Sequence, residues 1–280
     1  MSAKVVLLAG PSGSGKSHIA GRSGLPVFRL DDFYKDADDP TLPLSVELGI
    51  PDWDDVGAWH LDRAVAALAT LCSEGAVEVP TYDISLSRAT GTSVFRCDGA
   101  TTVVAEGVFA PDMAGFGFSD KPGTYGMAAW VDQLDGFFTA LGIERASLVG
   151  NSFGGGLAIS FAHRFPERVD RLVLMGSVGV DFPITDGLDR VWGYEPSIEN
   201  MRRLLDLFAY DRGLVDDELA QVRYQASIQP GFQESFSAMF PAPRQRWVDA
   251  MRTPDDVIAA LPHRTLVVHG RDDQIIPLEN

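Results

Sequence analysis

The stretch Ser147-Leu-Val-Gly150-Asn-Ser152-Phe-Gly154-Gly-Gly-Leu157 decides the fold. An apolar run at 147–150 enters a glycine-rich turn, and residues 157–163 follow with helical spacing. The turn fits the pattern G-x-S-x-G, in which small residues flank a serine because the strand-to-helix turn is sharp and crowded. The pattern is also common in ordinary glycine-rich turns. Between a strand and a helix, it predicts an exposed nucleophilic Ser152, with the Phe153 N–H as one donor to an oxyanion.

Strand-like runs alternate with helical periods on both sides of this turn, which is typical of an α/β fold. The sequence predicts a three-layer, doubly wound, mostly parallel sheet with a helical cap inserted at roughly 183–252. The expected strands are residues 5–9, 26–30, 102–105, 147–150, 171–175 and 265–268, and the expected helices include 60–71, 128–141 and 157–163.

The composition is ordinary for a globular protein, with 45% apolar and 22% charged residues among 280. Acidic residues outnumber basic ones by 39 to 23, and the resulting net charge of −16 argues against a nucleic-acid or anionic-membrane partner. The apolar runs are too short for a membrane span or a signal peptide. Cys72 and Cys97 lack metal-site spacing, so we expect buried free thiols in a cytoplasmic protein.

A carboxylate follows the last strand-like run, in His269-Gly-Arg-Asp272-Asp273. The acid of a catalytic triad is found at such a strand end, after the serine in chain order. None of the histidines stands where the general base of a triad belongs. His163 is expected at the surface of the helix after the turn, and His269 is expected to support the strand turn. The histidines of the chain are His18, His60, His163, His263 and His269.

Five stretches in the second half of the sequence match motifs of one known protein family. They are Ala110-Pro-Asp-Met-Ala-Gly-Phe-Gly-Phe-Ser119-Asp, Gly150-Asn-Ser-Phe-Gly-Gly-Gly, Trp192-Gly-Tyr-Glu-Pro-Ser-Ile-Glu-Asn-Met201, Val222-Arg-Tyr224 and His269-Gly-Arg-Asp-Asp273. Residues 110–280 thereby resemble the meta-cleavage product hydrolases, α/β-hydrolases that split carbon–carbon bonds in ring-fission dienoates.

This resemblance implies that Ser152 is the nucleophile and Asp273 the triad acid. It also implies that Arg223, in the cap, holds the anionic end of the substrate, and we assign Asn151 and Phe153 to the substrate site. The family's triad histidine would follow a few tens of residues after the aspartate, beyond the last residue of this sequence. The family's His-Gly oxyanion loop has no counterpart in the sequence. Weak or absent turnover is therefore expected.

The first half carries a second glycine-rich pattern directly after the run 5–9. The stretch Gly10-Pro-Ser-Gly-Ser-Gly15-Lys16-Ser17 matches G-x-x-x-x-G-K-[ST], the P-loop, whose backbone N–H groups wrap phosphates. Lys16 would reach the β- and γ-phosphates, and Ser17 would hold Mg²⁺. The alternative is a glycine-rich turn that binds nothing. The predicted ATP and Mg²⁺ site comprises Gly10, Ser12, Gly13, Ser14, Gly15, Lys16 and Ser17.

Four further stretches accompany the P-loop: Leu30-Asp31-Asp-Phe-Tyr34, Asp52-Trp-Asp54-Asp, Pro80-Thr-Tyr82-Asp83 and Val104-Ala-Glu106-Gly107. With it, they make residues 1–109 resemble the uridine kinases, a family of P-loop nucleoside kinases. The resemblance implies that Asp31 is the base that activates the sugar hydroxyl, and that Asp54 contacts the sugar and Tyr82 the pyrimidine. It also implies that Glu106 helps Ser17 to hold Mg²⁺, and we assign Arg88 to the substrate site. The alternative for Asp31 is a solvated acidic loop, and the family's arginine-bearing lid has no counterpart.

The sequence thus predicts a composite chain whose two parts join near 104–113. The strand at 102–106 can serve both parts, so we expect one continuous sheet in the strand order 2-3-1-4-5-6. The Cα atoms of Gly15 and Ser152 would then lie within about 15 Å of each other.

Three functions follow from the two resemblances. We favour ATP and Mg²⁺ binding with weak phosphoryl transfer to a nucleoside. The alternative is carbon–carbon bond hydrolysis of a ring-fission dienoate, and the third possibility is a non-catalytic nucleotide-binding chimera. The expected partner is a small-molecule nucleoside or dienoate, and a homo-oligomer is left open.

Overall fold

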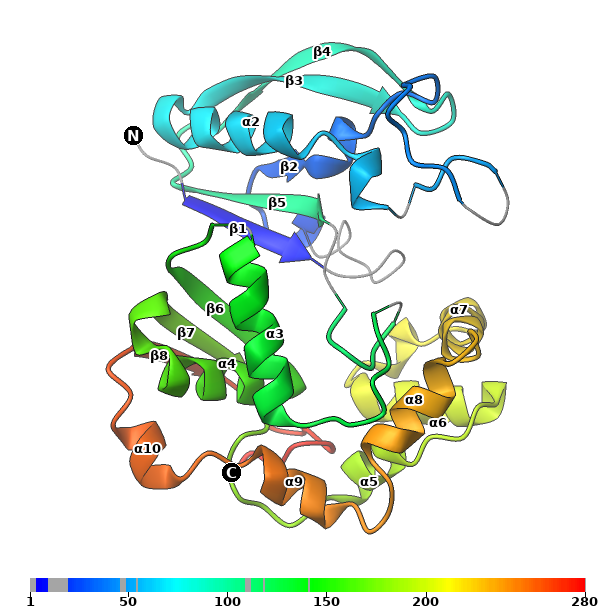
Figure 1. Cartoon of the computed structure of the whole chain (residues 1–280), viewed down its shortest axis with the longest axis vertical. Coiled ribbons are helices and arrows are strands. Elements are labelled where there is room, and N and C mark those ends of the chain that lie inside the picture. The colour runs from blue at the N-terminus through cyan, green and yellow to red at the C-terminus, as the bar shows by residue number, and fades with distance from the viewer. Residues whose placement is uncertain are drawn as a thin grey trace. The chain divides into compact units, whose positions relative to one another are not determined.

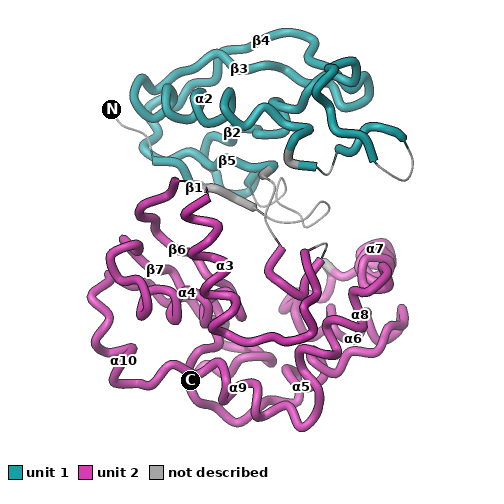
Figure 2. The backbone as a smooth tube through the Cα atoms, in the orientation of Figure 1, with its two compact units in different colours: residues 1–111 teal, residues 112–280 magenta. Residues whose placement is uncertain are grey.

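The chain forms two compact units, Met1–Pro111 and Asp112–Asn280 (Figure 2). The computed structural model describes residues 4–9, 20–45, 49–53, 55–108, 112–117, 119–140 and 142–279. Each unit has its own cluster of buried apolar side chains. Among the described residues, no helix has the length and hydrophobicity needed to cross a membrane.

Unit 1 contains a three-stranded parallel sheet and an antiparallel hairpin (Figure 1). In the sheet, β5 lies between the other two strands and pairs in parallel with both, and its Val103 and Ala105 are fully buried. The sheet consists of β1 (Lys4–Ala9), β5 (Thr102–Val108) and β2 (Val27–Arg29), and the hairpin of β3 (Ala76–Asp83) and β4 (Arg88–Arg96).

One long helix, α2 (Leu61–Glu74), covers the core of unit 1 and packs against β3. Its inward face carries Ala64, Ala67 and Leu71, which recur at helical spacing and are buried. The helix ends at Gly75, whose φ of 78° is the left-handed conformation that glycine adopts without a steric penalty. Two single turns of 3₁₀-helix, η1 (Leu30–Phe33) and η2 (Val56–Ala58), complete the unit.

Unit 2 is built on three parallel strands in the order β6-β7-β8. The helix α4 packs against β6 and β7, and α3 packs against α4, so helices form a layer beside the sheet. The short turn η3 (Pro166–Arg168) leads from α4 into β7. The bounds are β6 (Ala146–Asn151), β7 (Val169–Met175), β8 (Arg264–Val268), α3 (Met127–Ala140) and α4 (Phe153–Arg164).

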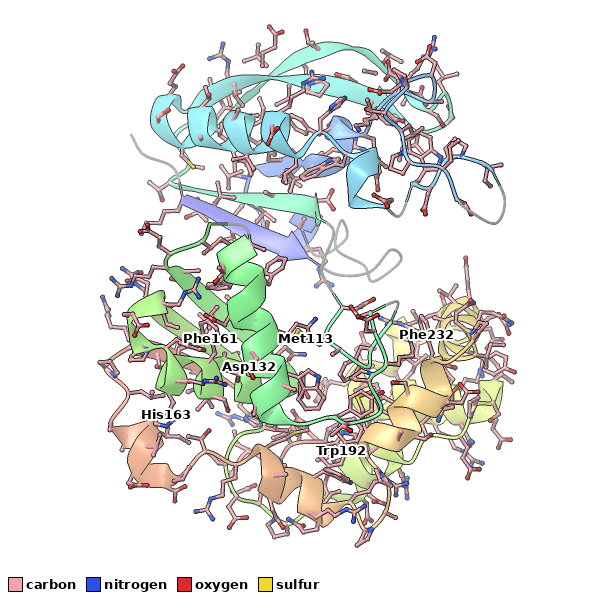
Figure 3. The ribbon with its side chains drawn as sticks, viewed as in Figure 1. Met113, Asp132, Phe161, His163, Trp192 and Phe232 are labelled. Carbon is pink, nitrogen blue, oxygen red and sulfur yellow. The ribbon has the colours of Figure 1, made fainter. Side chains whose placement is uncertain are left out.

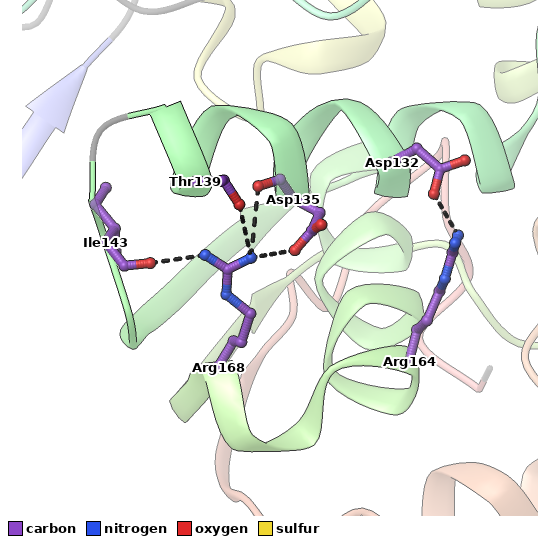
Figure 4. Close-up of polar contacts among 6 residues, drawn as sticks. All are labelled: Asp132, Asp135, Thr139, Ile143, Arg164 and Arg168. Carbon is purple, nitrogen blue, oxygen red and sulfur yellow. Dashed lines mark hydrogen bonds and ion pairs between the residues drawn. The ribbon is translucent and has the colours of Figure 1, made fainter.

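Two arginines fasten the helical layer of unit 2 (Figure 4). The Arg168 guanidinium donates to the Ile143 carbonyl at 2.8 Å and also binds the Asp135 carboxylate, and 17% of this arginine side chain is exposed. Arg164 pairs with Asp132 at 2.7 Å, but both side chains of this pair are about half exposed. The two ion pairs therefore differ in burial, although both involve a carboxylate of α3 and an arginine from the end of α4 or the turn after it.

Helices occupy the chain between β7 and β8, including the range 183–252, which contains no strand among its described residues. Side chains of Thr185, Ser197 and Asp216 cap three of these helices by accepting a backbone N–H of the first turn. The helices are α5 (Asp186–Trp192), α6 (Ile198–Phe208), η4 (Arg212–Leu214), α7 (Asp217–Ser227), α8 (Phe232–Met239), α9 (Gln245–Met251) and α10 (Asp255–Ala259). Their role as a cap stays a prediction.

The predicted α/β fold class is confirmed, since parallel strands alternate with helices in both units. The expected strand orders 2-3-1 and 4-5-6 appear as β2-β5-β1 in unit 1 and β6-β7-β8 in unit 2. The pair that would join them into one sheet, β1 with β6, lies between the two units and stays a prediction. Gly15, like the rest of Gly10–Ser17, lies outside the described residues, so its predicted distance from Ser152 is untested.

Candidate active site

Ser152 lies in a strained backbone turn between β6 and α4. Its φ of 53° and ψ of −117° fall outside the conformations that a residue with a Cβ atom readily adopts. The turn is held from both sides: the Ser152 N–H donates to the Met175 carbonyl at 2.9 Å, and the Ser152 carbonyl accepts from Gly155 at 3.0 Å and Val178 at 3.2 Å. Three backbone hydrogen bonds thus maintain a conformation that costs free energy.

Glycines allow the chain to pack closely around this turn. A Cβ on Gly150 would lie 2.6 Å from the Gly155 Cα, and a Cβ on Gly156 would lie 2.9 Å from a Val178 methyl carbon. A Cβ on Gly155 would overlap the Ser177 side chain. Gly154, which directly follows Phe153, has open space where its Cβ would be. The crowding expected on both sides of Ser152 is therefore present at Gly150 and absent at Gly154.

Phe153 is the first residue of α4, so its N–H belongs to the helical turn whose donors have no partner within the helix. Its ring packs edge-on against Trp130 at a centroid distance of 4.8 Å and lies 5.8 Å from the Phe116 ring. These contacts anchor the residue while its N–H stands at the positive end of the helix dipole. Asn151, the last residue of β6, is exposed.

Asp273 follows β8 in a loop that the carboxylate itself organises. Its Oδ1 accepts the N–H groups of Ile275 at 2.8 Å and Ile276 at 3.0 Å. Its Oδ2 lies 3.7 Å from the His269 Nε2 and 3.1 Å from where a Cβ on Gly176 would stand. Asp273 is therefore oriented by backbone amides, with its second oxygen turned toward the end of β7.

Backbone hydrogen bonds bring the serine and the acid to the same strand end. The N–H of Gly176 donates to the Val268 carbonyl at 3.0 Å, which joins the end of β7 to the end of β8. Ser152 binds the carbonyl of Met175, the residue before Gly176. Ser152 and Asp273, which lie far apart in the sequence, thus flank the Met175–Gly176 peptide.

The histidines of unit 2 lie apart from Ser152. His163 is exposed on α4, at the surface of the unit, whereas Phe161 two residues earlier is fully buried (Figure 3). The His263 Nε2 lies 2.8 Å from the Pro166 carbonyl, and the His269 Nε2 lies 3.0 Å from the Ile276 carbonyl. These polar contacts of His263 and His269 are made with residues other than Ser152, and the absence of a triad base stays a prediction.

Arg223, predicted to bind the substrate's anionic end, is exposed on α7. A cleft of about 540 Å³ lies nearby between α5 and α6, with Arg190, Tyr194, Arg203 and Leu207 in its lining. Neither Ser152 nor Asp273 lines this cleft.

In unit 1, the predicted site residues that the structure describes make structural contacts. Asp31 lies in η1, so close to Gly107 that a Cβ on this glycine would overlap its carboxylate. The buried Tyr82 donates its hydroxyl to the Lys35 carbonyl at 3.0 Å, and burial raises the pKa of this tyrosine. Arg88 forms an exposed ion pair with Asp38 at 3.3 Å.

Glu106 is 4% exposed within β5. Lys16, Ser17 and Asp54 lie outside the described residues. The described residues contain no group of three or more His, Cys, Asp or Glu side chains that could hold a metal ion.

The arrangement in unit 2, a strained serine after a parallel strand and a carboxylate at the end of a later one, defines an α/β hydrolase. A family model described as the alpha/beta hydrolase fold matches residues 106–280, which is more than half of the chain. The chain therefore belongs to the α/β hydrolase fold family.

Within that family, the similarity is to hydrolases of ring-fission products. The chain is 66% identical over 174 residues to a 2-hydroxymuconate semialdehyde hydrolase of Pseudomonas sp. (strain CF600), with 61% of this chain and 62% of the relative covered. It is 52% identical over 227 residues to a 2-hydroxy-6-oxo-2,4-heptadienoate hydrolase of Pseudomonas putida, with 76% and 82% covered. A crystal structure of a meta-cleavage product hydrolase matches 91% of this chain and 76% of its own at 45% identity and a TM-score of 0.60.

These findings contradict the predicted composite chain. The relatives are hydrolases, the solved hydrolase aligns with 91% of the chain, and none of the comparisons supports a uridine kinase segment. The predicted nucleoside kinase function and its ATP and Mg²⁺ cofactors are therefore wrong. The P-loop pattern is short and local, and similarity over most of the chain outweighs it. The roles of Lys16, Asp31 and the other first-half residues depended on the kinase resemblance and are withdrawn with it.

Proposed function

We propose that this chain hydrolyses a carbon–carbon bond in a 2-hydroxy-6-oxo-dienoate, with Ser152 as the nucleophile and Asp273 as the acid of the site. The observation that carries the proposal is the strained Ser152 turn, which presents a hydroxyl at the start of a helix. Two relatives of the chain, one named for a 2-hydroxy-6-oxo-dienoate, support the substrate class.

The chemistry follows from the positions of these groups. The dienol first tautomerises, moving the proton of its 2-hydroxyl group to carbon 5. The Ser152 hydroxyl then gives its proton to a base from solvent while its oxygen adds to the 6-oxo carbon. The negative charge that develops on the carbonyl oxygen faces the Phe153 N–H. Cleavage of the bond between carbons 5 and 6 leaves an acyl group on the serine. In the 2-oxo tautomer, the electron pair of that bond is delocalised through carbons 4 and 3 onto the 2-oxo group, and the resulting dienolate takes up a proton on that oxygen. Water then releases the acyl group as a carboxylic acid, so the net change is the addition of one water molecule.

Three further residues have proposed roles in binding. Asn151 and Phe153 stand next to the nucleophile and would contact the substrate, and the Arg223 guanidinium would bind its carboxylate. Asp273 would fix the orientation of a general base through the oxygen that faces the end of β7, because its other oxygen is occupied by two backbone amides. We further propose a cytoplasmic location, which suits a chain whose two cysteines are free thiols.

The nucleophile is tested by labelling the chain with a fluorophosphonate and locating the label by peptide mass spectrometry. We expect the label on Ser152, and we expect Ser152→Ala to reduce labelling by about 100-fold or more. Ser147→Ala is the matched control, because Ser147 is an exposed serine on the same strand. Labelling that is equal in the two variants would refute Ser152 as the nucleophile.

The substrate class is tested separately under single-turnover conditions, with the chain in excess over 2-hydroxymuconate semialdehyde and the loss of the dienoate chromophore followed. Cleavage that disappears in Ser152→Ala supports the proposal. A chain that is labelled at Ser152 and cleaves 4-nitrophenyl acetate but not the dienoate would overturn the substrate class while retaining the nucleophile.

A further inference from the structure

Both cysteines of the chain lie at one end of the helix α2 in unit 1. Cys72 lies in the last turn of α2, and Cys97 directly follows β4. The helix ends at Gly75, whose carbonyl accepts the N–H of Cys97 at 2.9 Å. The adjoining hairpin pairs Ala76 with Arg96, so the backbone on either side of this contact is also fixed. Cys97 is thus fastened to a residue less than one helical turn beyond Cys72.

The two cysteines differ in their burial. Cys97 is 5% exposed and belongs to the buried cluster that contains Ala67 and Leu71 of α2. Burial raises the pKa of the Cys97 thiol, and the neighbouring Cys72 thiol adds to this rise in pKa. Cys72 itself is only partly buried. The Cys72 thiol can therefore be reached from solvent, whereas burial protects the Cys97 thiol.

We propose that Cys72 and Cys97 form a thiol pair that closes reversibly to a disulfide when the chain meets an oxidised small-molecule thiol such as glutathione disulfide. This proposal is independent of the hydrolase function. A disulfide requires Cα atoms roughly 4.4–6.8 Å apart. Gly75 lies less than one helical turn beyond Cys72, and the hydrogen bond to its carbonyl places Cys97 at the same end of the helix as Cys72.

The reaction proceeds through two exchanges. The Cys72 thiolate attacks one sulfur of glutathione disulfide, forms a mixed disulfide and releases one glutathione thiolate. The Cys97 thiolate then attacks the Cys72 sulfur, closes the intramolecular disulfide and releases the second glutathione. Two protein thiols are oxidised and one glutathione disulfide is reduced to two glutathiones. The raised pKa of Cys97 lowers the fraction of this thiol that is present as the reactive thiolate.

The experiment incubates the full chain with glutathione disulfide, blocks the remaining thiols with N-ethylmaleimide and maps peptides without reduction. We expect a linked pair of peptides that carry Cys72 and Cys97, formed at least about tenfold faster in the native chain than in the chain unfolded in urea. Equal rates in the two states, or a native chain that carries glutathione on separate cysteines without a link, would overturn the proposal.

Two variants test the order of the exchanges. Cys97→Ser should accumulate glutathione on Cys72, because the resolving thiol is absent. Cys72→Ser should leave Cys97 largely unmodified in the folded state, because this thiol is buried. Rapid modification of Cys97 in Cys72→Ser, with the fold verified by circular dichroism, would contradict the assigned order. The native-chain comparison needs no variant and decides the pairing even where a substitution impairs folding.

Discussion

The strand ends of unit 1 and unit 2 both place a polar side chain next to a glycine, but the backbone strain falls on different residues. At the end of β5, the residue with positive φ is Gly107, at 99°, and Asp31 lies against it in an ordinary conformation. At the end of β6, the residue with positive φ is Ser152 itself, while Gly150 allows the following helix to pack closely.

The difference shows that a polar residue after a strand is not by itself evidence of a reactive group, whereas backbone strain on that residue is such evidence. Positive φ alone does not make the distinction, because Ser87 and Asp98 also have it, next to the ends of β4. Ser152 differs from a simple turn residue by its ψ of −117° and by the hydrogen bonds that hold both its N–H and its carbonyl.

The largest effect is expected from Gly150→Ala, which tests the packing around the strained turn directly. The new methyl group would overlap the backbone of Gly154 and Gly155, which cannot move without shifting α4. We expect unfolding to become easier by about 3 kcal/mol and fluorophosphonate labelling of Ser152 to be lost. Urea denaturation and labelling measure the two effects.

Gly154→Ala is the matched control, because a Cβ at this position meets nothing within 4 Å. It should change stability by less than about 0.5 kcal/mol. If both variants lose stability equally, the close approach at Gly150 does not explain the requirement for glycine.

A second comparison lies within unit 2, between two arginines that bridge the same layers. Arg168→Met should cost about 2 kcal/mol in the free energy of unfolding, because it leaves the Asp135 carboxylate and the Ile143 carbonyl without their shared donor. Arg164→Met should cost less than about 0.5 kcal/mol, because the pair with Asp132 is half exposed and screened by solvent. If urea denaturation shows equal losses in the free energy of unfolding for the two variants, burial does not determine how much these arginines contribute to stability.

Tyr82→Phe tests whether the hydroxyl group of this tyrosine contributes to the stability of unit 1. The substitution removes the hydroxyl that donates to the Lys35 carbonyl, and we expect a loss of about 1 kcal/mol in the free energy of unfolding. Labelling of Ser152 should be unchanged. A variant with unaltered stability in urea would show that the hydroxyl does not contribute to the fold.

The smallest effect is expected in the pH dependence of stability that arises from His60, the residue directly before α2. Burial, followed by the nearby positive charge of Arg63, lowers the pKa of this histidine below 6.5. The unfolded chain therefore binds the proton more readily, and stability should decrease as the pH falls from 6.5 toward the folded-state pKa. The urea midpoint should be lower at about pH 5.5 than at about pH 7.5. His60→Gln should reduce this difference, and an identical pH dependence in the variant would assign it to other groups.

Local patterns in the sequence determined the strands that carry the site. The apolar runs predicted at 147–150, 171–175 and 265–268 correspond to β6, β7 and β8, because a short continuous apolar run is typical of a strand in a parallel sheet. The hairpin was not predicted, because β4 is exposed along most of its length and carries no apolar period. Only its pairing with β3 makes this segment a strand.

The sequence by itself predicted the turn at Ser152, since G-x-S-x-G after an apolar run is a local signal. The choice of Asp273 as the expected acid came from the resemblance to the meta-cleavage product hydrolases. Equally local signals in the first half predicted a nucleotide site that the comparisons contradict, because a short motif says nothing about the chain around it. Tertiary structure alone decided that Ser152 is strained, that Asp273 turns one oxygen toward the end of β7, and that Cys97 is hydrogen-bonded to Gly75 at the end of the helix that carries Cys72. Each of these depends on hydrogen bonds between distant segments, and no local pattern of residues encodes which segments meet.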